Sequence, residues 1–196
     1  TAIYVPLPGF LLLPLSILAG IIAGGLYATL VAVLNMKFQS SIVICTLMLN
    51  YVANYIASYL VSYPFKDKSG DGLSLVTKTI PESTHFLQFS SSNTLNLGIV
   101  VAAVITILFF YMERKTVFGY ESKMTGLNPH FAKYGGVFEK KVMLKTMALS
   151  GAIAAVVGMC EIFGYKYRYT DGMFTSASYA WTGLMAALIA DLHPVG

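Results

Sequence analysis

Charged side chains are scarce in this chain of 196 residues, where they make up 11% of the total. A soluble domain usually carries about 25%. Long stretches contain no Asp, Glu, Lys or Arg at all, namely residues 1–36, 38–65, 86–112 and 172–190. Hydrophobic residues make up 56% of the chain, and its mean hydropathy is +0.68. This composition excludes an ordinary water-soluble domain and indicates an integral membrane protein.

Motifs of common catalytic sites are also missing. The chain has no GxxxxGK[ST] phosphate-binding loop, no HExxH and no nucleophile-elbow pattern. Its two cysteines, Cys45 and Cys160, lie inside apolar runs without metal-ligand spacing. We therefore expect no enzymatic activity and no cofactor, and if ATP drives this protein, another chain binds it. Aromatic and basic residues are not interleaved, so nucleic acid is not an expected partner.

The apolar runs have the length of membrane-spanning helices. A helix needs about 20 mostly apolar residues to cross the hydrocarbon core, and period-two alternation typical of a barrel is absent. The sequence predicts an all-α polytopic bundle with about four full spans, at Leu12–Met36, Ser41–Tyr63, Leu97–Met112 and Val142–Phe163. A last apolar segment, Tyr179–Leu192, covers only about 21 Å. We interpret it as either a half-helix or a truncated span.

The start of the chain does not resemble a leader. Thr1 is followed by no basic segment, and the first apolar run is longer than the core of a signal peptide. We therefore expect no cleaved signal. Because there is no initial Met, we also expect that residues 1–196 are one partial transmembrane domain of a longer protein.

The basic residues divide unequally between the two sides that these spans define. One side holds eight of them, at Lys37, Arg114, Lys115, Lys123, Lys133, Lys140, Lys141 and Lys145. The other side holds five, at Lys66, Lys68, Lys78, Lys166 and Arg168. Cytoplasmic loops carry the excess of Lys and Arg. We therefore predict that 113–141 is a cytoplasmic loop and that 64–96 is an external loop.

Small and polar residues mark the interiors of the predicted spans. Gly20 and Gly24 form a GxxxG pattern, and Gly151 lies among Ser and Ala, which predicts close helix packing. Polar side chains recur every fourth residue in the second span, at Thr46, Asn50, Asn54 and Ser58. Amides are costly in lipid, so this stripe faces other helices or a hydrated route. It forms either interhelical hydrogen bonds or the lining of a polar solute's path.

Two further residues are candidates for the same path. Glu161 lies near the end of an apolar run, where it either borders the path or pairs with Lys166 or Arg168. Trp181 offers an aromatic face on which a solute could stack.

The basic loop at 113–141 contains its own helix signals. Asn128 suits a helix cap and Pro129 a first turn, while Gly135 and Gly136 would end the helix. Phe131, Tyr134 and Val137 then recur every third residue and predict an apolar face for a groove in a partner. The alternative is an amphipathic helix that rests on the membrane surface.

Several short motifs occur in an order and spacing that resemble one transporter family. They are Ala23–Ala28, Thr46–Ala53, Asn96–Gly98, Thr125–Pro129, Ala132–Gly136, Met147–Ala152 and His193–Gly196. Over nearly its whole length, the chain resembles permease subunits of bacterial ABC importers for nucleosides and simple sugars. That family is related to the ribose and branched-chain amino acid permeases.

This resemblance implies a multi-pass protein of the bacterial inner membrane that forms a solute path through the lipid bilayer. It implies three protein partners: an ATP-binding cassette ATPase, a second permease subunit and a substrate-binding lipoprotein. It also implies a loop that couples the ATPase to the path, with the residues Gly126, Asn128, Pro129, Phe131, Ala132, Tyr134, Gly135 and Gly136. The stretch around Asn50 resembles the nucleoside branch.

Two positions depart from the family pattern and bear on the solute. Ser41 and Ile42 stand where members commonly have Asn and Glu, and the segment before Trp181 lacks the usual glycines. A secondary transporter or channel without an ATPase is the alternative function. An ATPase that copurifies with the chain would distinguish the two.

The predicted topology can be tested with single cysteines at Ser69 and Ser122, in full-length protein lacking Cys45 and Cys160. We expect an impermeant thiol reagent to label position 69 in intact cells and to leave position 122 unlabelled. The opposite labelling would reverse the topology.

Overall fold

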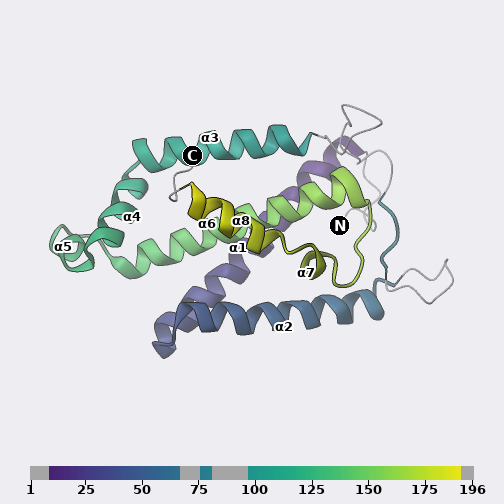
Figure 1. Ribbon diagram of the computed structural model, residues 1–196, viewed down its shortest axis with the longest axis horizontal. Coiled ribbons are helices and arrows are strands. Elements are labelled where there is room, and N and C mark those ends of the chain that lie inside the picture. The colour runs from purple at the N-terminus through teal and green to yellow at the C-terminus, as the bar shows by residue number, and fades with distance from the viewer. Residues whose placement is uncertain (1–8, 67–75, 81–96, 191–196) are drawn as a thin grey trace.

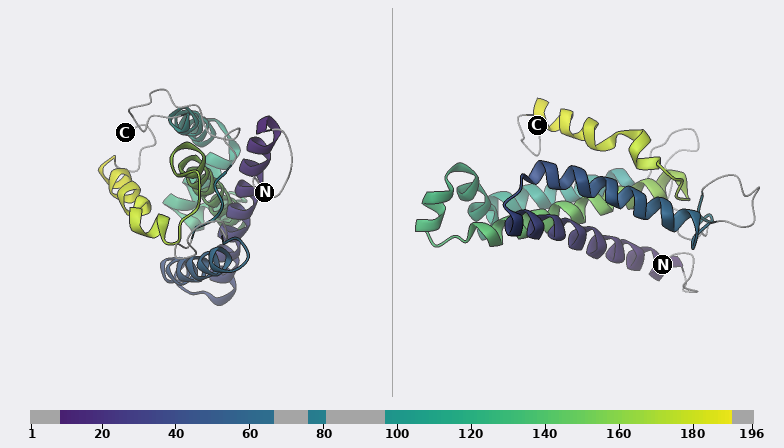
Figure 2. Two further views of the ribbon diagram at one scale, coloured as in Figure 1. Left: turned by 90° about the vertical axis from the view of Figure 1, so that its right-hand side faces the viewer. Right: turned by 90° about the horizontal axis from the view of Figure 1, so that it is seen from below.

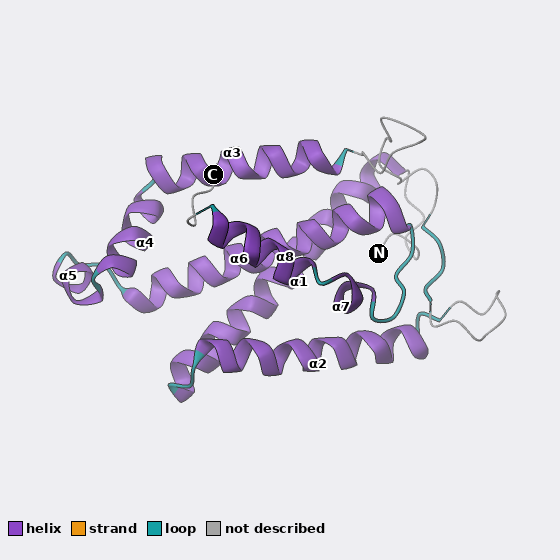
Figure 3. Ribbon diagram, viewed as in Figure 1, coloured by secondary structure: helices purple, strands orange, loops and turns teal. Residues whose placement is uncertain are grey.

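The computed structural model describes residues 9–66, 76–80 and 97–190, and helices dominate these ranges (Figure 3). They are α1 (Gly9–Phe38), α2 (Ile42–Ser62), α3 (Gly98–Lys115), α4 (Val117–Leu127), α5 (Pro129–Tyr134), α6 (Glu139–Glu161), the π-helix η2 (Ile162–Lys166), α7 (Met173–Ala177) and α8 (Tyr179–Ile189). Within these ranges the only strand-like pairings are two isolated bridges. The predicted all-α class is therefore confirmed.

Three of the described helices are long and apolar enough to cross a membrane. They comprise Leu11–Phe38, Ile42–Ser62 and Glu139–Lys166, and each overlaps a predicted span. Helix α3 occupies the place of the remaining full span, but its 18 residues rise only about 27 Å. They include Glu113, Arg114 and Lys115 at the C-terminal end. The structure thus shows three candidate spans where the sequence predicts about four. Helix α3 is not among them because three of its 18 residues are charged.

The long helices form a bundle around α1 and α6. These two helices cross in the middle, with α3 on one side and α2 on the other (Figure 1). Helices α4 and α5 lie at one end of the bundle, and α7 lies toward the opposite end (Figure 1). Helix α8 lies to one side of the other helices (Figure 2), and none of its residues is buried.

The contact between α1 and α6 is the most extensive between any two described helices, and glycines make it possible. A Cβ atom added at Gly24 would lie under 3.0 Å from the Gly151 carbonyl oxygen and from Ala155. A Cβ at Gly151 would come as close to Gly24 and to Ala28. The two backbones therefore touch directly. The prediction of close packing from small residues is confirmed, and the structure identifies the two partners.

At the end opposite α5, residues 76–80 pair with the segment that follows η2. The Thr77 amide donates to the Tyr169 carbonyl at 3.0 Å, and the Ile80 amide donates to the Tyr167 carbonyl at 2.9 Å. The Ile80 side chain packs on Phe163, which is 2% exposed. The two connections that the sequence places on the external side therefore meet at one end. The rest of the predicted external loop lies largely outside the described residues.

Helix α8 is shorter than a membrane crossing. Its 11 residues rise about 16 Å, and the residue before it, Ser178, has a left-handed backbone with a φ of 51°. The described part of the predicted final segment is thus a short helix. Residues 191 and 192 lie outside the described residues.

The glycine contact predicts a position-specific loss of stability. Gly151→Ala should force α1 and α6 apart and lower the free energy of unfolding by about 1–3 kcal/mol, as overpacking does. Gly183→Ala on α8 is the control, because a Cβ there meets nothing within 4 Å. Thermal unfolding in detergent compares the two variants, and an equal loss in both would contradict direct backbone contact.

Candidate coupling helix and solute path

Helix α5 begins with a side-chain cap. The Oδ1 atom of Asn128 accepts a hydrogen bond of 3.1 Å from the Phe131 amide, and Pro129 occupies the first turn. This geometry satisfies one of the amides that a helix leaves unpaired at its start. The predicted start at Asn128 and Pro129 is confirmed.

The same helix ends in a glycine motif. The Gly136 amide bonds to the Lys133 carbonyl at 3.1 Å, and the Val137 amide bonds to the Ala132 carbonyl at 3.0 Å. Gly136 has a φ of 81°, which a residue with a side chain rarely adopts. These two bonds form a Schellman motif around Gly135, the last residue of the helical turn. The predicted stop at the two glycines is confirmed.

The side chains of α5 divide between the bundle and its surroundings. Phe131 is 58% exposed and Tyr134 is 93% exposed, whereas Ala132 is 2% exposed. Ala132 is therefore packed against this chain and is not free for a partner. Val137 is half-buried and lies beyond the helix, so it does not share the helical face of the two aromatic residues.

Helix α4 joins α5 to the bundle through a tight corner after α3. The Thr116 hydroxyl accepts from the Gly119 amide at 3.3 Å and donates to the Met112 carbonyl. A Cβ at Gly119 would lie under 3.0 Å from the backbone of Glu113. The sequence pattern missed Gly119, because a lone glycine in a basic loop gives no sign of which backbone it approaches. Its role is to let α4 turn sharply away from α3.

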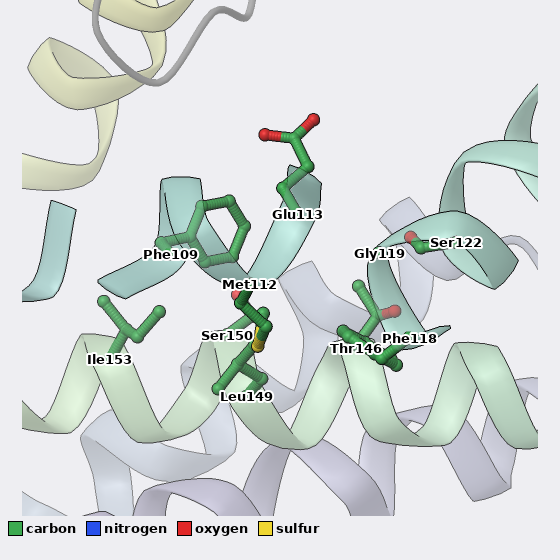
Figure 4. Close-up of a pocket in the computed structure, with 10 residues that line it drawn as sticks. All are labelled: Phe109, Met112, Glu113, Phe118, Gly119, Ser122, Thr146, Leu149, Ser150 and Ile153. Atoms are coloured by element: carbon green, nitrogen blue, oxygen red, sulfur yellow. The ribbon is translucent and has the colours of Figure 1, made fainter. Parts of the chain in front are cut away.

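A cavity of about 320 Å³ lies where α4 meets α3 and α6. Its lining residues are Phe109, Met112, Glu113, Phe118, Gly119, Ser122, Thr146, Leu149, Ser150 and Ile153. Figure 4 shows Met112 pointing from α3 toward α6, while the Glu113 carboxylate points away from α6. The cavity is partly open to the surroundings of the helices. Helix α4 contacts α6 less extensively than α1 does.

The residues of the polar stripe of α2 differ in their hydrogen-bond partners. The Thr46 hydroxyl bonds to carbonyls of its own helix, Ile42 and Val43, at 3.0 and 2.9 Å. Asn50 is exposed. Asn54 and Ser58 instead contact the connection between α6 and α8. Within the described ranges, the stripe therefore bonds to another segment only at the end that holds Asn54 and Ser58.

Two long-range hydrogen bonds join α2 to that connection. The Ser58 hydroxyl donates to Asp171 Oδ1 at 2.5 Å, and the Thr175 hydroxyl donates to Asn54 Oδ1 at 3.3 Å. Both partners were missed in the sequence. Asp171 and Thr175 lie in a polar stretch without periodicity, so no pattern relates them to α2.

Glu161 has a partner other than those considered from the sequence. Its Oε1 atom accepts a hydrogen bond of 2.7 Å from the Tyr179 hydroxyl at the start of α8. Lys166 lies over the Tyr165 ring instead, 5.0 Å from its centroid. Trp181 lies on α8 and is 62% exposed. Among the described residues, no hydrogen bond joins Glu161 or Trp181 to the α2 stripe.

A family model matches the whole chain, and known transport proteins match nearly all of it. A family model described as "Branched-chain amino acid transport system / permease component" matches residues 1–196, and the chain belongs to this family. It is 26% identical over 196 residues to the nucleoside ABC transporter permease protein NupB of Lactococcus lactis, covering 97% of this chain and 54% of that protein.

Two other relatives are named for different solutes. The chain is 28% identical over 190 residues to the guanosine ABC transporter permease protein NupP of Bacillus subtilis, covering 96% of this chain and 54% of that protein. It is 29% identical over 196 residues to the glucose ABC transporter permease protein TsgB13 of Haloferax volcanii, covering 96% and 51%. The chain thus spans about half the length of these relatives. No solved structure matches it.

The cap of α5 gives a prediction that is local to this helix. Asn128→Ala should weaken α5 by about 1 kcal/mol, because the Phe131 amide loses its acceptor, while Asn128→Ser should retain most of the cap. Amide hydrogen exchange of residues 129–134 measures the opening of the helix. Equal protection in the two variants would show that the side chain of Asn128 does not stabilise α5.

Proposed function

We propose that this chain is the membrane part of an ABC importer permease and that it forms a path for a nucleoside. Membership of the permease family supports the transport role. The substrate is proposed from the relatives, two of which are named for nucleoside or guanosine and one for glucose. A simple sugar is the related alternative. The proposed site of action is the bacterial plasma membrane.

The observation that carries the coupling role is α5, a short helix fixed at both ends with two exposed aromatic side chains. Such a helix can insert Phe131 and Tyr134 into a groove of another protein with little loss of conformational entropy, since its backbone is already ordered. We propose that the partner is a separate ATPase subunit, because this chain has no phosphate-binding loop. The residues proposed for coupling are Gly126, Asn128, Pro129, Phe131, Ala132, Tyr134, Gly135 and Gly136.

The roles within this segment differ. The two aromatic residues contact the ATPase, while the cap and the glycine motif hold the helix in shape. Ala132 anchors it to the bundle, since its side chain is buried. Force on α5 then passes through α4, which contacts both α3 and α6. The cavity beside α4 leaves room for this movement.

The proposed solute path borders α2, with Thr46, Asn50, Asn54, Glu161 and Trp181 as its candidate residues. Asn50 offers an exposed amide within the polar stripe of α2. A second permease subunit and a binding lipoprotein complete the proposed importer. The lipoprotein would select the solute, so these polar contacts need only be permissive.

The double variant Phe131→Ala and Tyr134→Ala tests the proposed function in the full-length permease. Buried aromatic anchors are worth about 2 kcal/mol or more each in such interfaces. We therefore expect the variant to insert normally, to retain less ATPase in a pull-down and to lose ATP-dependent nucleoside uptake. Reconstituted proteoliposomes with labelled nucleoside measure the uptake.

Tyr120→Ala is the matched control, since Tyr120 is a 62% exposed aromatic residue on α4, outside α5. It should retain both ATPase binding and uptake. Wild-type behaviour of the double variant would contradict coupling through α5. Uptake of nucleoside without any ATPase would instead favour a secondary transporter or channel.

A further inference from the structure

The two hydrogen bonds between α2 and the α6–α8 connection share one geometry. Asn54 and Ser58 are one turn apart on α2, and their partners Thr175 and Asp171 are also four residues apart, in reverse order. The two segments therefore run past each other in register. In both bonds a hydroxyl group donates to the oxygen of a carboxylate or an amide.

Apolar side chains pack this connection against α6. Met173 is 8% exposed, and the Phe174 ring lies 6.1 Å from the Tyr169 ring and faces Gly158 of α6, where an added Cβ would meet it at 3.5 Å. Between α2 and the connection, the described side-chain hydrogen bonds are the two at Asn54 and Ser58. Replacing one hydroxyl donor by another changes the net free energy of such a bond little, because the acceptor remains satisfied.

The backbone of the connection contains several special positions. Tyr167, Gly172 and Ser178 all have left-handed backbones, with φ values of 55°, 70° and 51°. They lie before, at the start of and after α7. Residues at the ends of short elements are where a connection absorbs a change of direction when it moves. The connection thus has a turning point on each side of the two hydrogen bonds.

From this geometry we infer that Asn54, Ser58, Asp171 and Thr175 form a latch at the end of the path opposite α5, opened by the hydroxyl groups of the solute. A ribose or sugar hydroxyl that donates to Asp171 takes the place of the Ser58 hydroxyl. One that donates to Asn54 takes the place of the Thr175 hydroxyl. The connection then moves away from α2 and lets the solute pass. This inference rests on the proposed function, and it gives the path a recognition chemistry common to nucleosides and sugars.

Reversible crosslinking tests the latch in the complete importer. Asn54→Cys and Thr175→Cys, in a background without Cys45 and Cys160, are joined by a short bifunctional methanethiosulfonate. We expect crosslinking to abolish the ATP-dependent uptake that the reduced variant itself shows, and dithiothreitol to restore uptake to the level of that reduced variant. Unchanged uptake by the crosslinked protein would overturn the latch, as would failure of the pair to crosslink in the resting importer.

A second measurement follows the latch during transport. Crosslinking should be slower in an importer that turns over solute with ATP and binding protein than in the resting importer, because the latch is then partly open. Equal rates would overturn the inference. Tyr55→Cys with Thr175→Cys is the control pair, because Tyr55 neighbours Asn54 but is 76% exposed and lies about 100° further around the α2 helix. It should crosslink poorly in both states.

A second cysteine pair keeps the latch testable if the first double variant fails to fold. Ser58→Cys with Asp171→Cys probes the other hydrogen bond and should give the same reversible block. The wild-type importer, assayed in parallel, separates the two proposals. If it shows no ATP-dependent uptake of nucleoside or sugar, the proposed function fails and the latch with it, whereas uptake that continues through a closed crosslink defeats only the latch.

Discussion

The direct backbone contact between α1 and α6 is the constraint on which the rest of this structure depends. Lipid provides little hydrophobic drive for helices to associate, so close approach through small residues has to supply the attraction. Gly24 and Gly151 provide that approach because each occupies the space that the other's Cβ would need. The remaining helices are arranged around this pair: α3 and α4 contact α6, and α2 contacts α1.

The two ends of the bundle differ in how they are held. At the end with α5, hydrogen bonds between residues close in sequence fix the backbone. They involve a capping asparagine, a glycine motif and a threonine at the corner before α4. At the opposite end, segments far apart in sequence are joined by backbone and hydroxyl hydrogen bonds. The first end therefore presents the ordered helix proposed to bind the ATPase, and the second contains the polar contacts of the proposed latch.

The large exposed apolar surface follows from the same architecture. Side chains such as Leu26 on α1, Tyr55 on α2 and Ile107 on α3 are each more than 60% exposed. In a membrane protein such positions face lipid or other helices. The chain spans only about half of the curated relatives it matches. The exposed apolar side chains agree with the three helices that are long and apolar enough to cross a membrane.

Local features were readable from the sequence, because they depend on residues close together in the chain. Charge-free runs determined the helical membrane class, and Asn128 with Gly135 and Gly136 determined both ends of α5. Long-range pairings were not readable. No pattern related Gly24 to Gly151, Asp171 to Ser58 or Tyr179 to Glu161. Only the tertiary structure decided these pairings, since hydrogen bonds and backbone contacts between distant segments depend on how the helices are placed in space, and side-chain spacing along one helix does not specify its partner.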